Sequence, residues 1–113
     1  FNVNRAVLAA GVAAIKDSEW TKKAIDHNAL WSKKIFSMLK EYNIKTNEPA
    51  VNFFLMNFDE TKINSEEVFE KLAADKLIVR KMTQYKIPNS LRLTIGNKEA
   101  NENFIKSMGS ILK

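Results

Sequence analysis

The chain has 113 residues, of which 45% are hydrophobic and 27% charged, and its formal net charge is +5. This length and composition predict one folded, soluble domain with a modest core. The absence of cysteine excludes a disulfide framework and thiolate chemistry, and no apolar run reaches membrane-spanning length. A basic chain can bind nucleic acid, but here lysines and acidic residues interleave, which favours ordinary helix faces of mixed charge.

Two helices are predicted at the N-terminal end. Asn4 to Lys16 is rich in alanine, and its small residues permit close packing against another element. Asp17-Ser18-Glu19 predicts a helix restart with Ser18 as the N-cap, and a long helix follows to about Tyr42. Residues at spacings of three, four or seven predict its buried stripe: Trp20, Ala24, Trp31, Ile35, Met38 and Tyr42.

His27 lies within this stripe. A lone histidine could be an acid–base group, but a partly buried packing residue with one hydrogen bond is the favoured interpretation. The chain offers no cysteine and no second histidine to complete a zinc site with it.

Two strands and a helix are expected next. Ile44 to Glu48 is typical of a short edge strand, closed by Pro49. Ala50 to Phe58 is apolar on both faces and is therefore predicted to be a central, covered strand. Its polar exception is Asn52, for which local backbone hydrogen bonds at the strand entrance are one explanation. Asn64 to Lys76 predicts a helix that opens with a capping box.

The stretch from Leu77 to Gly96 predicts two alternating strands joined by turn residues at 87–90. Each strand carries one arginine, Arg80 in the first and Arg92 in the second. Two guanidinium groups on neighbouring strands can converge on one carboxylate or phosphate. The alternative is that both are solvated strand arginines in surface ion pairs.

A last helix is predicted from Asn97 to Lys113. The element order is helix, helix, strand, strand, helix, strand, strand, helix. We therefore expect an α+β two-layer domain, with helices packed on one face of a small, mainly antiparallel sheet.

Several stretches together resemble the C-terminal region of fold-type I, pyridoxal-phosphate-dependent aminotransferases, and most closely the histidinol-phosphate aminotransferases. They occur in the same order as in that family: Phe1-Asn2-Val3-Asn4, without the family's preceding proline, Asn52-Phe53-Phe54-Leu55, Ile78-Val79-Arg80, Tyr85-Lys86-Ile87-Pro88, Leu91-Arg92-Leu93-Thr94-Ile95-Gly96 and Asn97-Lys98-Glu99-Ala100-Asn101.

The resemblance implies a division of the chain and a role for three residues. Residues 1–17 would be the helix that crosses from a large domain, and residues 18–113 the small domain of a longer protein. Arg92 would grip the carboxylate or another anionic group of the substrate, Arg80 would lie towards the far end of the same pocket, and Asn52 at its edge. The parent enzyme would transfer an amino group between histidinol phosphate and 2-oxoglutarate in histidine biosynthesis.

The family's Schiff-base lysine lies in a Ser-Lys-x-x-Gly-Leu-Ala-Gly pattern, which this chain lacks. Ser32-Lys33 is followed by Lys34-Ile35-Phe36, so Lys33 does not inherit that role. The resemblance therefore implies that pyridoxal 5'-phosphate is bound by the large domain, that this chain supplies no catalytic, cofactor-binding or metal-binding residue, and that it is inactive alone. The parent is expected to be a cytoplasmic homodimer that binds neither membrane nor nucleic acid.

Two alternatives remain open at this stage. The first is an aromatic or other amino-acid aminotransferase of the same class. The second belongs to a different class, a stand-alone α/β nucleic-acid-binding module in which Phe53 and Phe54 would stack on bases. No RNP-type Gly-Phe-x-Phe pattern occurs, and both phenylalanines lie in the strand that we expect to be most buried.

Overall fold

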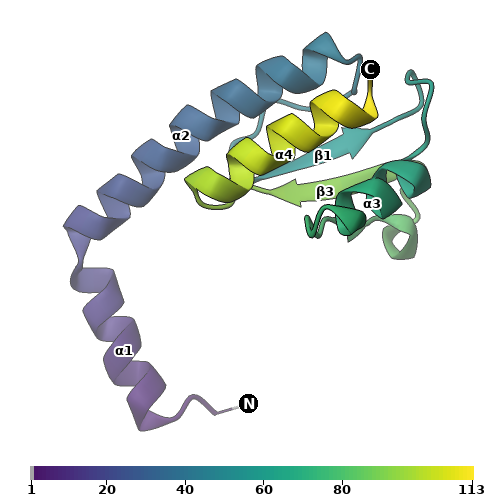
Figure 1. Ribbon diagram of the computed structural model, residues 1–113. Helices are drawn as coiled ribbons and strands as arrows, with labels where there is room; N and C mark the ends of the chain where they lie inside the picture. The colour runs from purple at the N-terminus through teal and green to yellow at the C-terminus, as the bar shows by residue number, and fades with distance from the viewer. Residues whose placement is uncertain (1) are drawn as a thin grey trace.

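The structure is a computed structural model that describes residues 2–113. The elements are α1 (Arg5–Lys16), α2 (Ser18–Glu41), β1 (Phe53–Asn57), α3 (Ser65–Ala74), β2 (Arg80–Lys81), the 3-10 helix η1 (Thr83–Tyr85), β3 (Ser90–Thr94) and α4 (Lys98–Ile111). Helix α1 extends away from the body that the other elements form (Figure 1). Among residues 2–113, no helix has both the length and the apolar character needed to cross a bilayer.

The three strands form an antiparallel sheet in the order β1-β3-β2. Alternation places Leu91 and Leu93 of β3 beside Met56 and Phe54 of β1, all four buried. These side chains share one core with residues of α2, α3 and α4, among them Ile35, Leu39, Val68, Leu72, Phe104 and Met108. The predicted α+β domain, with its helices on one face of the sheet, is confirmed.

The strand predicted to be central is instead an edge strand. β3 pairs on both sides, whereas within residues 2–113 the outer edge of β1 meets only an isolated bridge between Lys45 and Asn57. Only one face of β1 is covered by helices, so burial alternates along the strand: Phe54 is 1% exposed and its neighbour Phe53 is 41% exposed. The expectation that both phenylalanines are buried is therefore wrong for Phe53.

The strand predicted at 44–48 is reduced to that bridge, because Ile44, its first residue, hydrogen-bonds to the end of α2. Asn43 adopts a left-handed conformation with φ 56°, and the Ile44 amide donates back to the Leu39 carbonyl over 2.9 Å. This is a Schellman motif, in which the hydrophobic residue after the left-handed position packs onto the helix. Ile44 is accordingly buried in the core and not part of a ladder.

The same motif shortens the strand predicted at 77–82 to Arg80–Lys81. At the end of α3, Lys76 is left-handed with φ 62°, and the Leu77 amide donates to the Leu72 carbonyl over 2.8 Å. The residues directly after α3 therefore cap that helix and do not pair with β3.

The helix starts match the sequence in part. Asn64 and Glu67 form the predicted capping box. The N-cap of α2 is Asp17, one residue before the predicted Ser18. Trp20, predicted to be buried, is 67% exposed, because the first turns of α2 project beyond the core (Figure 1). His27 is partly buried and its Nε2 donates to the Gly96 carbonyl over 2.9 Å, which confirms the packing interpretation.

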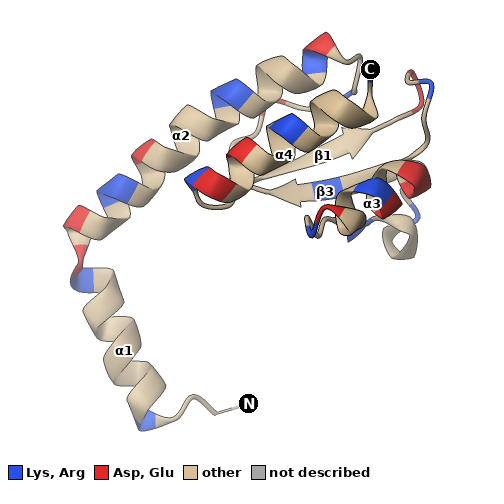
Figure 2. Ribbon diagram, viewed as in Figure 1, with Lys and Arg blue, Asp and Glu red and all other residues tan. Residues whose placement is uncertain are grey.

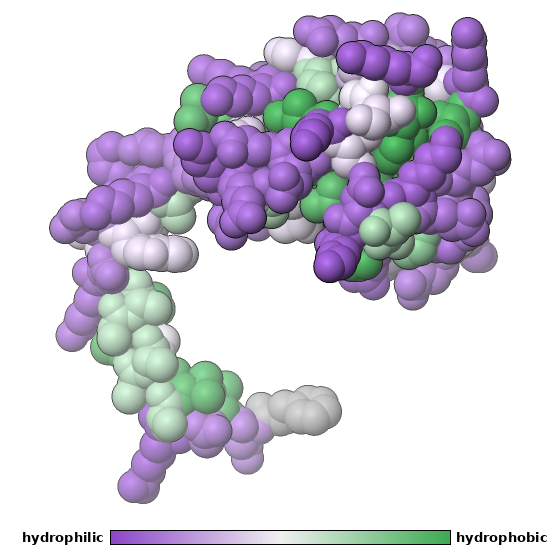
Figure 3. All heavy atoms as spheres, in the orientation of Figure 1, coloured by the Kyte–Doolittle hydropathy of each residue, from purple (hydrophilic) through white to green (hydrophobic). Residues whose placement is uncertain are grey.

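Helix α1 has no buried residue. Large apolar side chains are exposed along it, including Val7, Leu8, Val12 and Ile15. The space-filling view shows an arm with much hydrophobic surface, and the charge view shows charged residues only near its two ends (Figures 2 and 3). Helix α1 is therefore not stabilised by burial of apolar side chains in this structure.

Candidate functional site

The face of the sheet opposite the helices carries both arginines singled out from the sequence. Arg80 in β2 is the direct antiparallel partner of Arg92 in β3, and Leu55 of β1 is the partner of Arg92 on its other side. Because directly paired residues project from the same face, the two guanidinium groups share this open face.

Arg80 and Arg92 line one hollow of about 490 Å³, together with Phe69, Ile78 and Thr94 among others. Arg80 is exposed and Arg92 half-buried. Within residues 2–113, no carboxylate lies within 4 Å of either guanidinium, since the ion pairs of the described chain all involve lysines. Like charges directly opposite in a sheet are unfavourable, so this uncompensated pair is an unusual local arrangement.

Each arginine instead contacts an aromatic ring. The guanidinium carbon of Arg80 is 5.0 Å from the centre of the Tyr85 ring, and its Nη2 donates to the Tyr85 hydroxyl over 2.5 Å. The guanidinium carbon of Arg92 is 5.3 Å from the Phe53 ring centre. Both contacts are cation–π interactions, which stabilise a guanidinium without cancelling its charge.

Arg92 also has an unsatisfied donor. Its Nε is buried and has no hydrogen-bond partner among the described residues. A buried unpaired donor costs free energy, so this Nε is an unfavourable feature of the site. The nearby Lys81 differs, because it pairs with Glu66 and lies 4.3 Å from the Phe69 ring centre. The two arginines are therefore the available cations of this hollow.

Asn52 does not join the arginine pair. Its carbonyl accepts from the Ile95 amide over 2.8 Å, which continues the β1–β3 register and directs its side chain to the helix-covered face. There it lines a second hollow of about 880 Å³, with Trp20 and His27. The structure thus brings two of the three predicted site residues together and leaves Asn52 on the opposite face.

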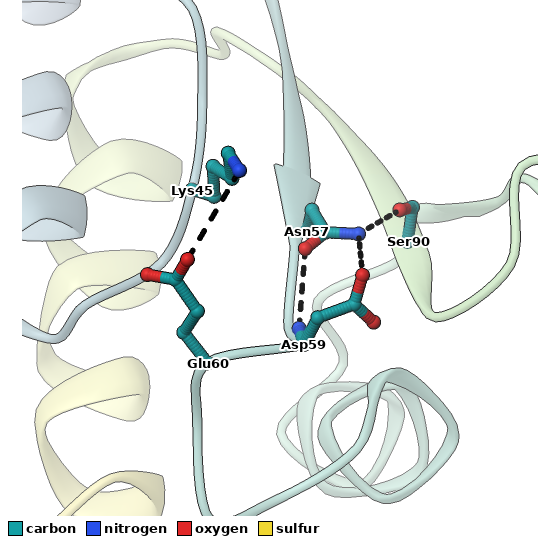
Figure 4. Close-up of polar contacts among 5 residues, drawn as sticks. All are labelled: Lys45, Asn57, Asp59, Glu60 and Ser90. Atoms are coloured by element: carbon teal, nitrogen blue, oxygen red, sulfur yellow. Dashed lines mark hydrogen bonds and ion pairs between the residues drawn. The ribbon is translucent and has the colours of Figure 1, made fainter.

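A polar network fixes the sheet at the start of β3. The Asn57 amide nitrogen donates to the Asp59 carboxylate over 3.0 Å and to the Ser90 hydroxyl over 3.2 Å (Figure 4). Asn89 donates to Asp59 over 2.8 Å and accepts from the Ser65 amide, which is the first residue of α3. The hydrogen bonds from Asn89 and then Asn57 lower the pKa of the Asp59 carboxyl. The network thereby ties β1, β3 and α3 together two residues before Arg92.

Sequence reasoning missed Tyr85 and Phe53 as partners of the arginines. Tyr85 lies five residues after Arg80, in a segment interpreted as part of a connection between strands. Phe53 pairs with Thr94, which makes it a diagonal neighbour of Arg92. The pairing register of β1 with β3 would have revealed that contact, but the register depends on which residues belong to the turn before β3.

The sequence of this chain matches the family described as Aminotransferase class I and II over residues 1–108. A histidinol-phosphate aminotransferase of Pelagibacter ubique is 36% identical over 112 residues, which cover 98% of this chain and 31% of that protein. One of Campylobacter jejuni is 37% identical over 113 residues, which cover 100% of this chain and 30% of that protein. The chain thus spans about a third of the length of the curated relatives it matches.

A solved structure shares the fold. The crystal structure of the histidinol-phosphate aminotransferase from Clostridium acetobutylicum superposes with a TM-score of 0.75 at 16% sequence identity, over 85% of this chain and 29% of that one. At this identity the likeness concerns the fold alone, whereas the family match covers nearly the whole sequence. The chain therefore belongs to the family of class I and II aminotransferases.

Proposed function

We propose that this chain is the small domain of a histidinol-phosphate:2-oxoglutarate aminotransferase, in which Arg92 and Arg80 bind the anionic groups of the substrates. The observation that carries the proposal is the cross-strand arginine pair, which has no carboxylate partner among residues 2–113 and lines a hollow of about 490 Å³. The names of the relatives support the choice of substrate. An aromatic or other amino-acid aminotransferase is the alternative within the same class.

The two arginines suit different anions. Arg92 is half-buried and has no carboxylate partner among the described residues, and a guanidinium can bind one carboxylate through two parallel hydrogen bonds. A phosphate carries close to two negative charges near neutral pH and can use a second guanidinium. Arg80, directly opposite, is the candidate for that second contact.

The residues of this chain do not fit a site for the pyridoxal phosphate that the family implies. The cofactor needs a lysine for its aldehyde and a cradle for its phosphate. Lys81 beside the hollow is paired with Glu66, and Lys33 lines a different hollow on α2. We therefore assign the cofactor to the remainder of the enzyme and derive no step through it.

Residues 1–17 are proposed to connect this domain to the rest of the enzyme. Helix α1 exposes Val7, Leu8 and Val12 and buries nothing. Packing against a large domain would cover this surface, as the resemblance implies for the segment that crosses between domains. A homodimeric assembly and a cytoplasmic location stay predictions.

Steady-state kinetics of the full-length enzyme test the proposal. Arg92→Ala should lower kcat/KM for histidinol phosphate by about a hundredfold, since a desolvated, charge-assisted contact is worth about 2–5 kcal/mol. Arg80→Ala should weaken the binding of histidinol phosphate by about 1.5–3 kcal/mol. It should weaken the binding of phenylalanine, which lacks a phosphate, much less. Lys106→Ala, which removes an exposed cation of α4 away from this hollow, is the control.

Two results would count against the proposal. Unchanged turnover of both donors in Arg92→Ala would remove Arg92 from the site. Equal losses for both donors in Arg80→Ala would reject phosphate binding and favour an aminotransferase for substrates without phosphate.

A further inference from the structure

The connection between β2 and β3 folds Tyr85 back onto Arg80. It forms the 3-10 helix η1, in which the Tyr85 amide donates to the Met82 carbonyl over 3.0 Å. The next residue, Lys86, is left-handed with φ 57°, and its amide donates to the Thr83 carbonyl over 2.9 Å. The backbone of this connection is thus held by its own hydrogen bonds, and it presents the tyrosine at a defined place.

Tyr85 contacts Arg80 in two ways at once. Its ring lies 5.0 Å from the guanidinium carbon, and its hydroxyl oxygen accepts a hydrogen bond from Nη2 over 2.5 Å. A guanidinium has five N–H donors, so one hydrogen bond leaves most of them free. The acceptor is neutral, and the positive charge of Arg80 is therefore oriented but not cancelled.

The contact with Tyr85 offsets the repulsion that arises because Arg80 and Arg92 are direct cross-strand partners. An exposed Arg80 opposite Arg92 would be driven away by repulsion, and it would lose side-chain entropy when a ligand fixed it. A carboxylate partner would hold it in place but would compete with an anionic substrate. A tyrosine holds it without that competition, which is the advantage of preorganisation in binding.

We propose that Tyr85 is a positioning residue that holds Arg80 beside Arg92, so that the two guanidinium groups together receive the phosphate of a phosphate ester. This inference rests on the proposed function and deepens it. By this inference, Tyr85 helps the enzyme to discriminate between phosphorylated and unphosphorylated amino donors. A substrate with a single carboxylate needs only Arg92.

The test compares histidinol phosphate with histidinol in the full-length enzyme, because these donors differ only in the phosphate. Tyr85→Phe removes the hydroxyl and should raise the KM for histidinol phosphate about threefold to tenfold, the effect of one lost hydrogen bond. Tyr85→Ala also removes the ring and should raise it further. The KM for histidinol should change less than twofold, as should both KM values in the control Tyr42→Phe.

A double variant separates positioning from a general structural role. If Tyr85 acts through Arg80, adding Tyr85→Ala to Arg80→Ala should raise the KM for histidinol phosphate no further. Equal effects of Tyr85→Ala on both donors, or a full additional effect in the double variant, would overturn the inference. A third result would also overturn it: Tyr85→Ala leaves the KM for histidinol phosphate unchanged while Arg80→Ala raises it. In that case the proposed function would still hold. If neither variant changes either donor, the proposed role of Arg80 fails and the inference fails with it.

NMR of the full-length enzyme, labelled with ¹⁵N at arginine, provides a readout independent of activity. Stacking on Tyr85 should move the Arg80 Nε–Hε resonance upfield through the ring current, and Tyr85→Ala should abolish the shift while Tyr42→Phe preserves it. An Arg80 resonance at its ordinary position in the unmodified chain would overturn the inference.

Discussion

Replacing Arg92 by methionine should abolish anion binding yet leave the stability of the domain nearly unchanged. Methionine keeps an unbranched apolar stem, so packing along the strand is retained. The change relieves the charge opposition with Arg80, a gain of roughly 0.2–1 kcal/mol. It also removes the cation–π contact with Phe53, a loss of roughly 0.5–1 kcal/mol. These contributions have opposite signs, so the free energy of unfolding should change by less than about 1 kcal/mol.

Urea unfolding of the 113-residue chain measures this balance. Inorganic phosphate should stabilise the unmodified chain, because a ligand that binds only the folded state raises its stability, and it should not stabilise Arg92→Met. Arg5→Met is the control, since it removes the same charge from exposed helix α1 and should keep the response to phosphate. A loss of more than about 2 kcal/mol in Arg92→Met would refute the reasoning, because it would make Arg92 a structural residue.

Three further predictions concern the scaffold. Asp59→Asn should destabilise the chain most above pH 4. The pKa of Asp59 is lowered on folding, so the stability that its carboxylate contributes is lost as the pH falls below the ordinary value of 3.8. Urea unfolding at several pH values will measure this difference. Lys76→Gly should raise the free energy of unfolding by about 0.5–1 kcal/mol, because glycine relieves the left-handed strain, whereas Lys71→Gly inside α3 should lower it by about 1 kcal/mol. Asn52→Ala should leave phosphate binding to the 113-residue chain unchanged in a calorimetric titration, because Asn52 lies on the opposite face from the arginines.

The sequence predicted the helices and the strand around Arg92 well, because these features depend on local pattern, whereas the strand around Arg80 is shorter than predicted. The capping box at Asn64, the Leu-Arg-Leu-Thr alternation around Arg92 and the single hydrogen bond of His27 all follow from spacing and residue chemistry. In the structure Arg80 and Arg92 are cross-strand partners and line one hollow. Their role in binding substrate stays a prediction.

The errors arose where tertiary packing decides between local alternatives. Ile44 and Leu77 have strand-like neighbours, but each closes a Schellman motif because a left-handed non-glycine residue precedes it. Glycine is the usual signal for such an ending, and here asparagine and lysine occupy those positions. Strand order was equally hidden, since an apolar run such as β1 looks the same at the centre of a sheet or at an edge whose inner face is buried.

The composition of the open face supports the proposal that it faces the rest of the enzyme and not bulk water. Phe53 is 41% exposed and Ile78 is 78% exposed beside two arginines without carboxylate partners among the described residues. A solvated surface would gain nothing from such a combination of apolar side chains and unpaired charge. A cleft between two domains would gain from both, because covering the apolar groups lowers the local dielectric and strengthens the attraction of Arg80 and Arg92 for a bound anion. The features that look unfavourable in the isolated domain are therefore consistent with the proposed role of this face as one wall of a substrate pocket.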